Sequence, residues 1–157
     1  MRLLGCGGRK HRLGPIDLAI VAAIHRPQAH LFLAGLRRRL EALAPAWPWH
    51  EPVEAAYHGG APGADTGFGA CAAQLGIPVE RFPYKSELGK AGGPARNAEM
   101  LVGLRGEERL PPATGVLAYP GGSGTADMVR RAHGSGVPVL DLAEHAAALE
   151  PYQRWQK

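Results

Sequence analysis

The stretch YPGGSGTADMV (residues 119–129) joins an apolar run at 115–119 to the pattern of a helix at 126–135. The turn between them holds three glycines, a serine and a threonine. Glycines let the backbone approach a ligand closely, and the free N–H groups in the first turn of a helix attract an anion. The stretch therefore predicts a strand, a glycine-rich turn and a helix that together bind a phosphate.

A second glycine-rich loop, HGGAPGAD, occupies residues 58–65. It follows an expected strand at 53–57 and runs into an expected helix at 64–75. Two loops of this kind in one chain suggest a pocket for a phosphorylated, nucleotide-like small molecule.

Apolar runs alternate with helical patterns along the chain. Strands are expected at Arg2–Cys6, 53–57, 77–82, 115–119 and 137–140, helices at 16–24, Leu31–Leu43, 64–75, 94–104, 126–135 and 143–149, and polar or proline-rich loops at 44–52, 83–92 and 105–112. The alternation predicts an α/β protein with a Rossmann-like three-layer fold and a mainly parallel sheet of about five strands. Ligands of such sheets bind beyond the carboxyl ends of the strands, so both glycine loops and residues 7–9 should converge there.

The composition, 45% hydrophobic and 20% charged, predicts a single globular domain over residues 1–157. The longest apolar run, 16–24, is shorter than the roughly 20 residues that span a membrane, and no signal-peptide pattern opens the chain. We therefore expect a cytoplasmic protein without membrane contact. Cys6 and Cys71 are expected to be reduced thiols. The histidines and cysteines show no metal-ligand spacing, so no metal and no cofactor are expected.

Basic residues are concentrated in two short runs, RKHR at 9–12 and RRR at 37–39, in a chain of net charge +4. The second run lies on an expected helix, where it forms either a solvated face or a phosphate-binding patch. Binding of single-stranded nucleic acid is therefore one hypothesis, although aromatic residues for base stacking make up only 6% of the chain.

Several motifs occur in the order and spacing of the SLOG superfamily: HGGAPGAD, GIPVERFP, GKAGGPARNAEML, LAYPGGSGTADMVRRA and GVPV. Together with GGR at 7–9, they resemble the YspA branch, the cpYpsA-related SLOG family. The resemblance covers residues 58–140 and the first strand. It implies a Rossmann-like fold that binds nucleotides or their derivatives, and a homodimer with the final helix or the tryptophan loop at 44–52 as candidate contacts.

The superfamily includes the Lonely Guy phosphoribohydrolases, which cleave the bond between a base and ribose 5′-phosphate. It also includes sensors of signalling nucleotides and a branch that binds single-stranded DNA. Lonely Guy enzymes carry PGGxGTxxE with a catalytic glutamate, whereas Met128 occupies that position here and the carboxylate is Asp127. A shift of one residue turns a helical side chain by about 100°. Hydrolysis of an N-glycosidic bond and non-catalytic sensing of a nucleotide therefore both stay open.

These motifs give the candidate site residues. The catalytic candidates are Arg96, Glu99 and Asp127. The ligand-binding candidates are Gly8, Arg9, Gly59, Gly60, Gly63, Asp65, Asn97, Pro120, Gly121, Gly122, Ser123, Gly124 and Thr125. Structural alternatives are an N-cap at Ser123 or Thr125, helix-dipole stabilisation by Asp65 and Asp127, and an ion pair within one helix between Arg96 and Glu99.

Overall fold

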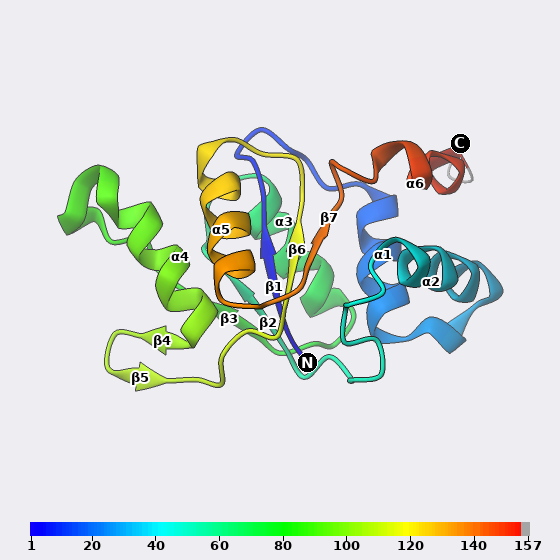
Figure 1. The fold of residues 1–157 in the computed structure, drawn as a ribbon, viewed down its shortest axis with the longest axis horizontal. Helices are drawn as coiled ribbons and strands as arrows, with labels where there is room; N and C mark the ends of the chain where they lie inside the picture. The colour runs from blue at the N-terminus through cyan, green and yellow to red at the C-terminus, as the bar shows by residue number, and fades with distance from the viewer. Residues whose placement is uncertain (155–157) are drawn as a thin grey trace.

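A parallel sheet of five strands forms the centre of the computed structural model, which describes residues 1–154 (Figure 1). The strands are β1 (Arg2–Cys6), β2 (Ala55–His58), β3 (Val79–Arg81), β6 (Gly115–Ala118) and β7 (Val139–Asp141). Their order across the sheet is β3-β2-β1-β6-β7, and every neighbouring pair is parallel. The predicted Rossmann-like three-layer fold is therefore confirmed.

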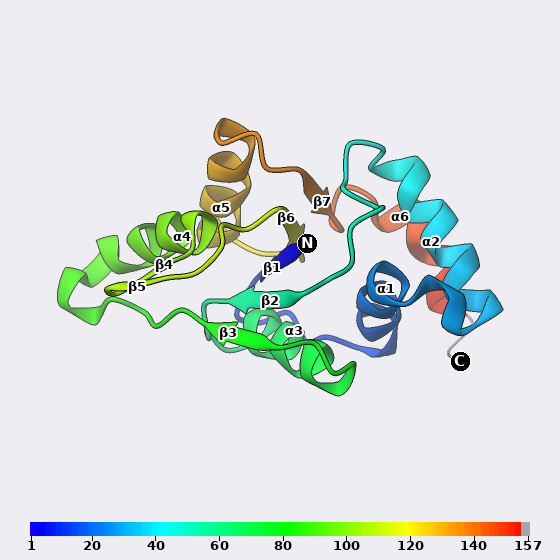
Figure 2. The same ribbon diagram turned by 90° about the horizontal axis from the view of Figure 1, so that it is seen from below.

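Helices cover both faces of this sheet. They are α1 (Pro15–His25), α2 (Leu31–Leu43), α3 (Ala64–Gln74), α4 (Gly92–Val102), α5 (Ser123–Gly134) and α6 (Ala146–Gln153). Helices α1 and α3 lie on one face, α4 and α5 lie on the other, and α2 and α6 lie beyond α1 (Figure 2). From β1 the chain proceeds to β2 and β3 on one side of the sheet, and later from β6 to β7 on the other side. Because crossovers between parallel strands are right-handed, these two opposite directions place their helices on opposite faces of the sheet.

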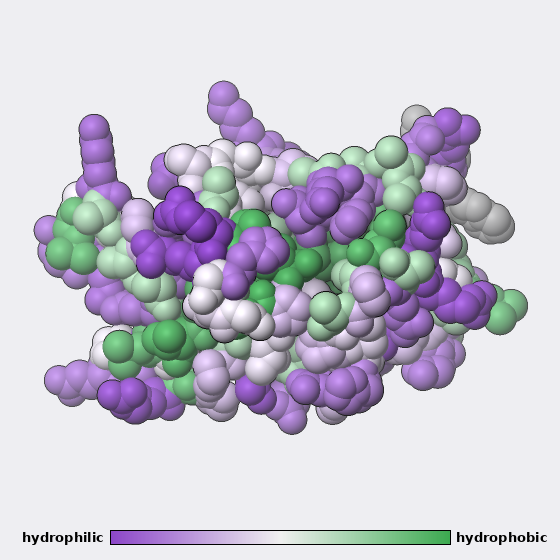
Figure 3. All heavy atoms as spheres, viewed as in Figure 1, coloured by the Kyte–Doolittle hydropathy of each residue, from purple (hydrophilic) through white to green (hydrophobic). Residues whose placement is uncertain are grey.

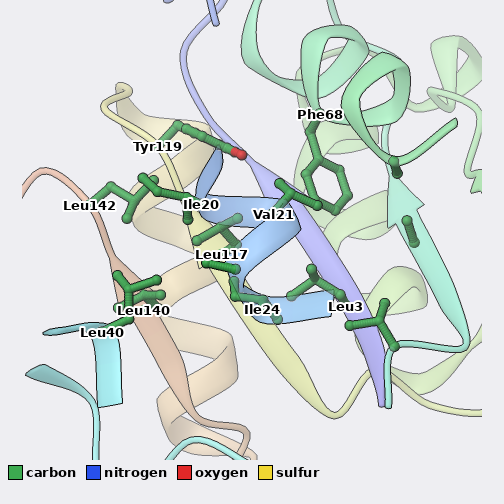
Figure 4. Close-up of a cluster of buried hydrophobic side chains, with 14 of the residues drawn as sticks. Leu3, Ile20, Val21, Ile24, Leu40, Phe68, Leu117, Tyr119, Leu140 and Leu142 are labelled. Carbon is green, nitrogen blue, oxygen red and sulfur yellow. The ribbon is translucent and has the colours of Figure 1, made fainter. Parts of the chain in front are cut away.

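The side chains of β1 alternate between two hydrophobic cores, because successive residues of a strand point to opposite faces. Leu3 belongs to the core that α1 and α3 cover, together with Phe68 and Leu117 (Figure 4). Leu4 and Cys6 belong to the core beneath α4 and α5. Because β1 is buried on both faces, its sequence is a continuous apolar run rather than a polar–apolar alternation.

The face that carries α4 and α5 is covered less completely at the β7 edge of the sheet. Val129, Val137 and Val139 are only partly buried there. Figure 3 shows hydrophobic surface in the region between α5 and α6, with hydrophilic residues around it. The hydrophilic surface of this face is therefore interrupted near β7.

Short elements occupy segments that the sequence predicted as connections. They are the 3-10 helices η1 (Pro27–Ala29) and η2 (Ser86–Ala91) and a hairpin of β4 (Leu104–Arg105) and β5 (Glu108–Arg109). Arg105 stabilises the hairpin, with guanidinium nitrogens 2.6 Å from Glu80 and 2.7 Å from Glu108. The sequence could not reveal these strands, because two residues are too few to show a period.

Helix α5 begins at Ser123, three residues before the start that the sequence predicted. Its first turn therefore includes Gly124 and Thr125 of the glycine-rich stretch. Asp127 lies in the second turn, so its interpretation as a helix-start carboxylate is wrong, because the free N–H groups are confined to the first turn. Asp65 does lie in the first turn of α3.

Arg37 belongs to the interior rather than to a basic surface. Its guanidinium donates hydrogen bonds to the carbonyls of Ala23 and Ile24 at the end of α1, at 3.2 and 3.0 Å. It also lies 4.5 Å from the ring centre of Trp49. Arg37 thus supplies donors that the last carbonyls of α1 need. The solvated face predicted for the run at 37–39 is confirmed for Arg38 and Arg39, which are exposed, and is wrong for Arg37, which belongs to neither a solvated face nor a phosphate-binding patch.

The tryptophan loop at 44–52 packs against the rest of the chain. Trp47 is buried and lies beside Gly115 at the start of β6. Trp49 is half-buried, and its indole N–H donates to the carbonyl of Ala44 at 2.7 Å. Both rings therefore have contacts within the chain, which leaves less of this loop for contact with a second subunit.

Among residues 1–154, no helix is long and apolar enough to cross a bilayer. The same residues contain no group of three or more His, Cys, Asp or Glu side chains placed to hold a metal ion.

We predict that Gly5→Ala in β1 destabilises the protein. A Cβ atom at this position would lie 2.2 Å from ring carbons of Phe68, and overpacking of this kind costs about 1–3 kcal/mol in the free energy of unfolding. Gly35→Ala in α2 is the matched control, because nothing lies within 4 Å of its added Cβ; it should be neutral or stabilise by up to about 1 kcal/mol. Urea denaturation measures both, and equal losses would contradict the packing of Gly5.

Candidate functional site

The loops that follow β1, β2 and β6 meet at the carboxyl edge of the sheet, where the strand order reverses. The backbone N–H of Gly8 donates to the carbonyl of Pro120 at 2.9 Å. The carbonyl of Gly8 accepts from the N–H of Ala64 at 3.2 Å. The predicted convergence of the three loops is therefore confirmed, and it occurs at the position where ligands of open α/β sheets bind.

A pocket of about 430 Å³ opens among these loops and the first turns of α4 and α5. The predicted site residues that line it are Gly8, Arg9, Asp65, Arg96, Asn97, Gly122, Ser123, Gly124 and Thr125. Gly7, in the stretch 7–9 that the sequence placed at this edge, also lines it. Further lining residues were not among the candidates: Cys6, Ala61, Tyr84, Lys90, Gly93, Pro94 and Met100. Tyr84 follows β3, so the rule that strand ends carry the site could have indicated it.

The other predicted site residues do not line this pocket; they are Gly59, Gly60, Gly63, Glu99, Pro120, Gly121 and Asp127. Most of the glycines among them are required by close packing. A Cβ at Gly59 would lie 2.4 Å from Cζ of Arg96, and one at Gly121 would lie 2.0 Å from Oγ1 of Thr125. Gly63, just before α3, has a φ of 89°, which a side chain rarely adopts. These positions shape the loops.

Gly122 and Gly124 differ from the glycines that pack against the chain. No heavy atom lies within 4 Å of a Cβ built at either position, and both residues line the pocket. Glycine in the first turn of a helix is less stabilising than alanine. Gly124 lies in that first turn, so neither packing nor helix stability explains its glycine, whereas Gly122 is the N-cap of α5, a position where glycine is preferred over alanine.

The pocket lining carries more positive than negative charge. Within the described chain, its cations are Arg9, Lys90 and Arg96, and its single carboxylate is Asp65. Together with the free N–H groups at the start of α5, this excess of cations favours an anionic ligand.

Asp65 is buried at the pocket wall, with 4% of its surface exposed. Burial raises the pKa of its carboxyl, while the positive charge of Arg96 and hydrogen bonds from the backbone N–H groups of Ala61, Gly7 and Gly59 oppose that rise. The carboxylate therefore connects the loops after β1 and β2 as well as facing the pocket.

Arg96 and Asn97 bring α4 to the glycine-rich loops. Nη1 of Arg96 donates to the carbonyl of Gly59 at 3.0 Å, while its buried Nε has no hydrogen-bond partner among the described residues. Nδ2 of Asn97 donates to the carbonyl of Gly124 at 3.1 Å and to Oδ2 of Asp127 at 3.0 Å. Asn97 therefore fixes the start of α5 against α4.

Asp127 is held in ion pairs on α5 itself. Nε of Arg131 lies 2.8 Å from its Oδ2, and Arg130 binds its other oxygen. Burial raises the pKa of Asp127, but hydrogen bonds from Arg131 and Asn97 and the charge of Arg130 outweigh burial and hold the pKa below its usual value. The carboxylate is thus fully engaged outside the pocket.

Glu99 is engaged in a similar way. Its carboxylate lies 2.6 Å from Nζ of Lys85. Arg96 instead bonds to Gly59, so the structure does not contain the ion pair between Arg96 and Glu99 that was one alternative. Two of the three catalytic candidates therefore have partners that keep them away from the pocket.

Cys6 is the one thiol in the lining of this pocket. It is a free cysteine, and burial raises its pKa well above the usual range, with Asp65 and Asp141 adding to the rise. A thiol that stays protonated is a poor nucleophile, so Cys6 acts here as an apolar wall.

No family model, no curated protein and no solved structure matches this chain.

We predict that Asp127→Asn lowers the free energy of unfolding by about 1–2 kcal/mol at pH 7, because Arg130 and Arg131 lose their charged partner. The pKa of Asp127 is lower in the folded than in the unfolded protein, so its stabilising contribution is complete above the unfolded value of about 3.9. The difference between wild type and variant should shrink as the pH falls below that value.

Urea denaturation from pH 7 to pH 3 measures this difference. Glu150→Gln is the control, because Glu150 in α6 forms an exposed ion pair with Arg154, the residue after that helix, and such pairs contribute little. A gap between wild type and Asp127→Asn that stays constant with pH would contradict the assignment.

Proposed function

We propose that this chain binds a phosphorylated, nucleotide-like ligand in the pocket at the carboxyl edge of the sheet. The observation that carries the proposal is the open space at Gly124, which lines the pocket in the first turn of α5 although neither packing nor helix stability favours glycine there. A ligand whose phosphate approaches the backbone of α5 supplies the missing reason for glycine there.

The phosphate would be bound by the first turn of α5. Free N–H groups and the hydroxyls of Ser123 and Thr125 are the donors on one side. Arg9 and Arg96 are the cations that balance its charge, and the guanidinium group pairs well with phosphate oxygens. A volume of about 430 Å³ lies within the usual size range of small-molecule pockets.

The sugar would lie against Asp65 and Asn97. A carboxylate repels a phosphate but accepts hydrogen bonds from hydroxyl groups, so Asp65 suits the ribose end of a nucleotide.

Binding without cleavage is the form of this function that the geometry favours. Asp127 and Glu99 are held in ion pairs outside the pocket, and a hydrolase needs a carboxylate near the ribose, where positive charge develops as the base departs. Sensing or sequestering a nucleotide therefore has more support than N-glycosidic hydrolysis, for which Asp65 is the remaining carboxylate.

Binding of single-stranded nucleic acid has lost part of its support, since Arg37 is internal.

Membership of the SLOG superfamily, in the YspA branch, belongs to the same proposal. It rests on the agreement between the glycine-rich motifs and the loops that meet at the pocket. The homodimer that the resemblance implies is also proposed, and sedimentation equilibrium would measure it.

We predict that Gly124→Ala weakens nucleotide binding at least tenfold without lowering the stability of the free protein. The added methyl group meets no atom of the chain but occupies the space at the start of α5 that we assign to the phosphate. Gly134→Ala, at the other end of α5, is the matched control, because its Cβ also meets nothing within 4 Å.

Titration calorimetry with nucleoside 5′-monophosphates, together with thermal unfolding, would measure both effects. Equal affinity in the two variants would contradict the assignment of the phosphate site. Chromatography of the same samples would test for cleavage: free base released by wild type would favour the hydrolase over the sensor.

A further inference from the structure

Tyr84 is an exposed aromatic side chain held at the edge of the pocket. It follows β3, is 45% exposed and lines the same pocket as the glycine-rich loops. Within the described chain, it is the one aromatic residue in that lining. The exposed hydrophobic residues Leu88 and Val102 do not line the pocket, so exposure alone does not distinguish Tyr84.

Two features of the chain fix the position of the Tyr84 ring. Its hydroxyl donates a hydrogen bond to the carbonyl of Gly89 in η2. The ring lies over the start of α4, where a Cβ on Gly92 would be 3.1 Å from Cζ of Tyr84 and one on Gly93 would be 3.8 Å from its Cε2. The close approach to Gly92 would be lost with a larger residue there. An exposed ring is thus anchored at its hydroxyl and at one edge.

The ring and the proposed phosphate site reach the pocket from different helices. Tyr84 lies over the first turn of α4, and Gly122 and Gly124 lie at the start of α5; both helix starts are at the carboxyl edge of the sheet (Figure 1). Asp65, which we assign to the sugar, lines the pocket as well. A nucleotide bound by its phosphate at α5 would have its base free to reach an aromatic surface.

We propose that Tyr84 is the residue on which the base of the bound nucleotide stacks. This inference rests on the proposed function and concerns the base of the nucleotide, for which the glycine-rich loops provide no binding surface. Every base has an aromatic face, so stacking on Tyr84 selects nucleotides over sugar phosphates rather than one base over another. The pocket is thereby specific for a nucleoside phosphate that retains its base.

The test compares two probes, adenosine 5′-monophosphate and ribose 5-phosphate, by titration calorimetry. We expect wild type to bind the nucleotide more tightly than the sugar phosphate. Tyr84→Leu should weaken binding of the nucleotide roughly 5- to 150-fold and leave binding of ribose 5-phosphate unchanged. Tyr84→Phe keeps the ring and should retain most of the preference.

Leu88→Ala in η2 is the control, because Leu88 is similarly exposed at 47% but does not line the pocket. Thermal unfolding of each variant identifies any loss of folding. If Tyr84→Leu weakens both probes equally, or neither, stacking is overturned while the proposed function stands. If wild type binds neither probe, nor the monophosphates of guanosine, cytidine and uridine, the proposed function fails and the inference falls with it.

Discussion

The site depends on the two hydrogen bonds that the backbone of Gly8 makes to the neighbouring loops. Its N–H binds the carbonyl of Pro120 and its carbonyl binds the N–H of Ala64, so the loop after β1 is fixed between the loops after β6 and β2. A Cβ on Gly8 would lie 3.0 Å from the carbonyl of Pro120 and from Cα of Gly121. Buried backbone groups need such partners, and the close approach that satisfies them here also brings the pocket walls together.

Asn97 fixes α4 and α5, the two helices that frame the pocket, to each other, as Gly8 fixes the loops. It is buried, and its amide reaches both a backbone carbonyl in the first turn of α5 and the carboxylate of Asp127. Asp127 in turn is oriented by Arg130 and Arg131. A carboxylate that the sequence suggested for chemistry therefore has a structural role, which is to hold the start of α5 at a fixed distance from α4.

The five strands of the parallel sheet, the six α-helices and the convergence of the loops could be predicted from sequence, because they depend on local periodicity and on the general rule for strand ends. The start of α5 could not, since serine and threonine near the turn allow the helix to begin at more than one residue. The ion pair between Glu99 and Lys85 could not be predicted either, because it joins a helix and a loop through side chains whose direction no sequence motif indicates. Tyr84 belongs to no motif, and only its position after β3 indicates it.

The arrangement of strands has a consequence for the order in which the site is assembled. Strand β1 lies at the centre of the sheet but pairs with β6, more than a hundred residues later in the chain. The pocket lining likewise runs from Cys6 to Thr125. During synthesis, β2 and β3 can join β1 early, whereas its other edge stays unpaired until β6 leaves the ribosome. A nascent chain therefore acquires the pocket at the carboxyl edge of the sheet as one of the last features of the fold.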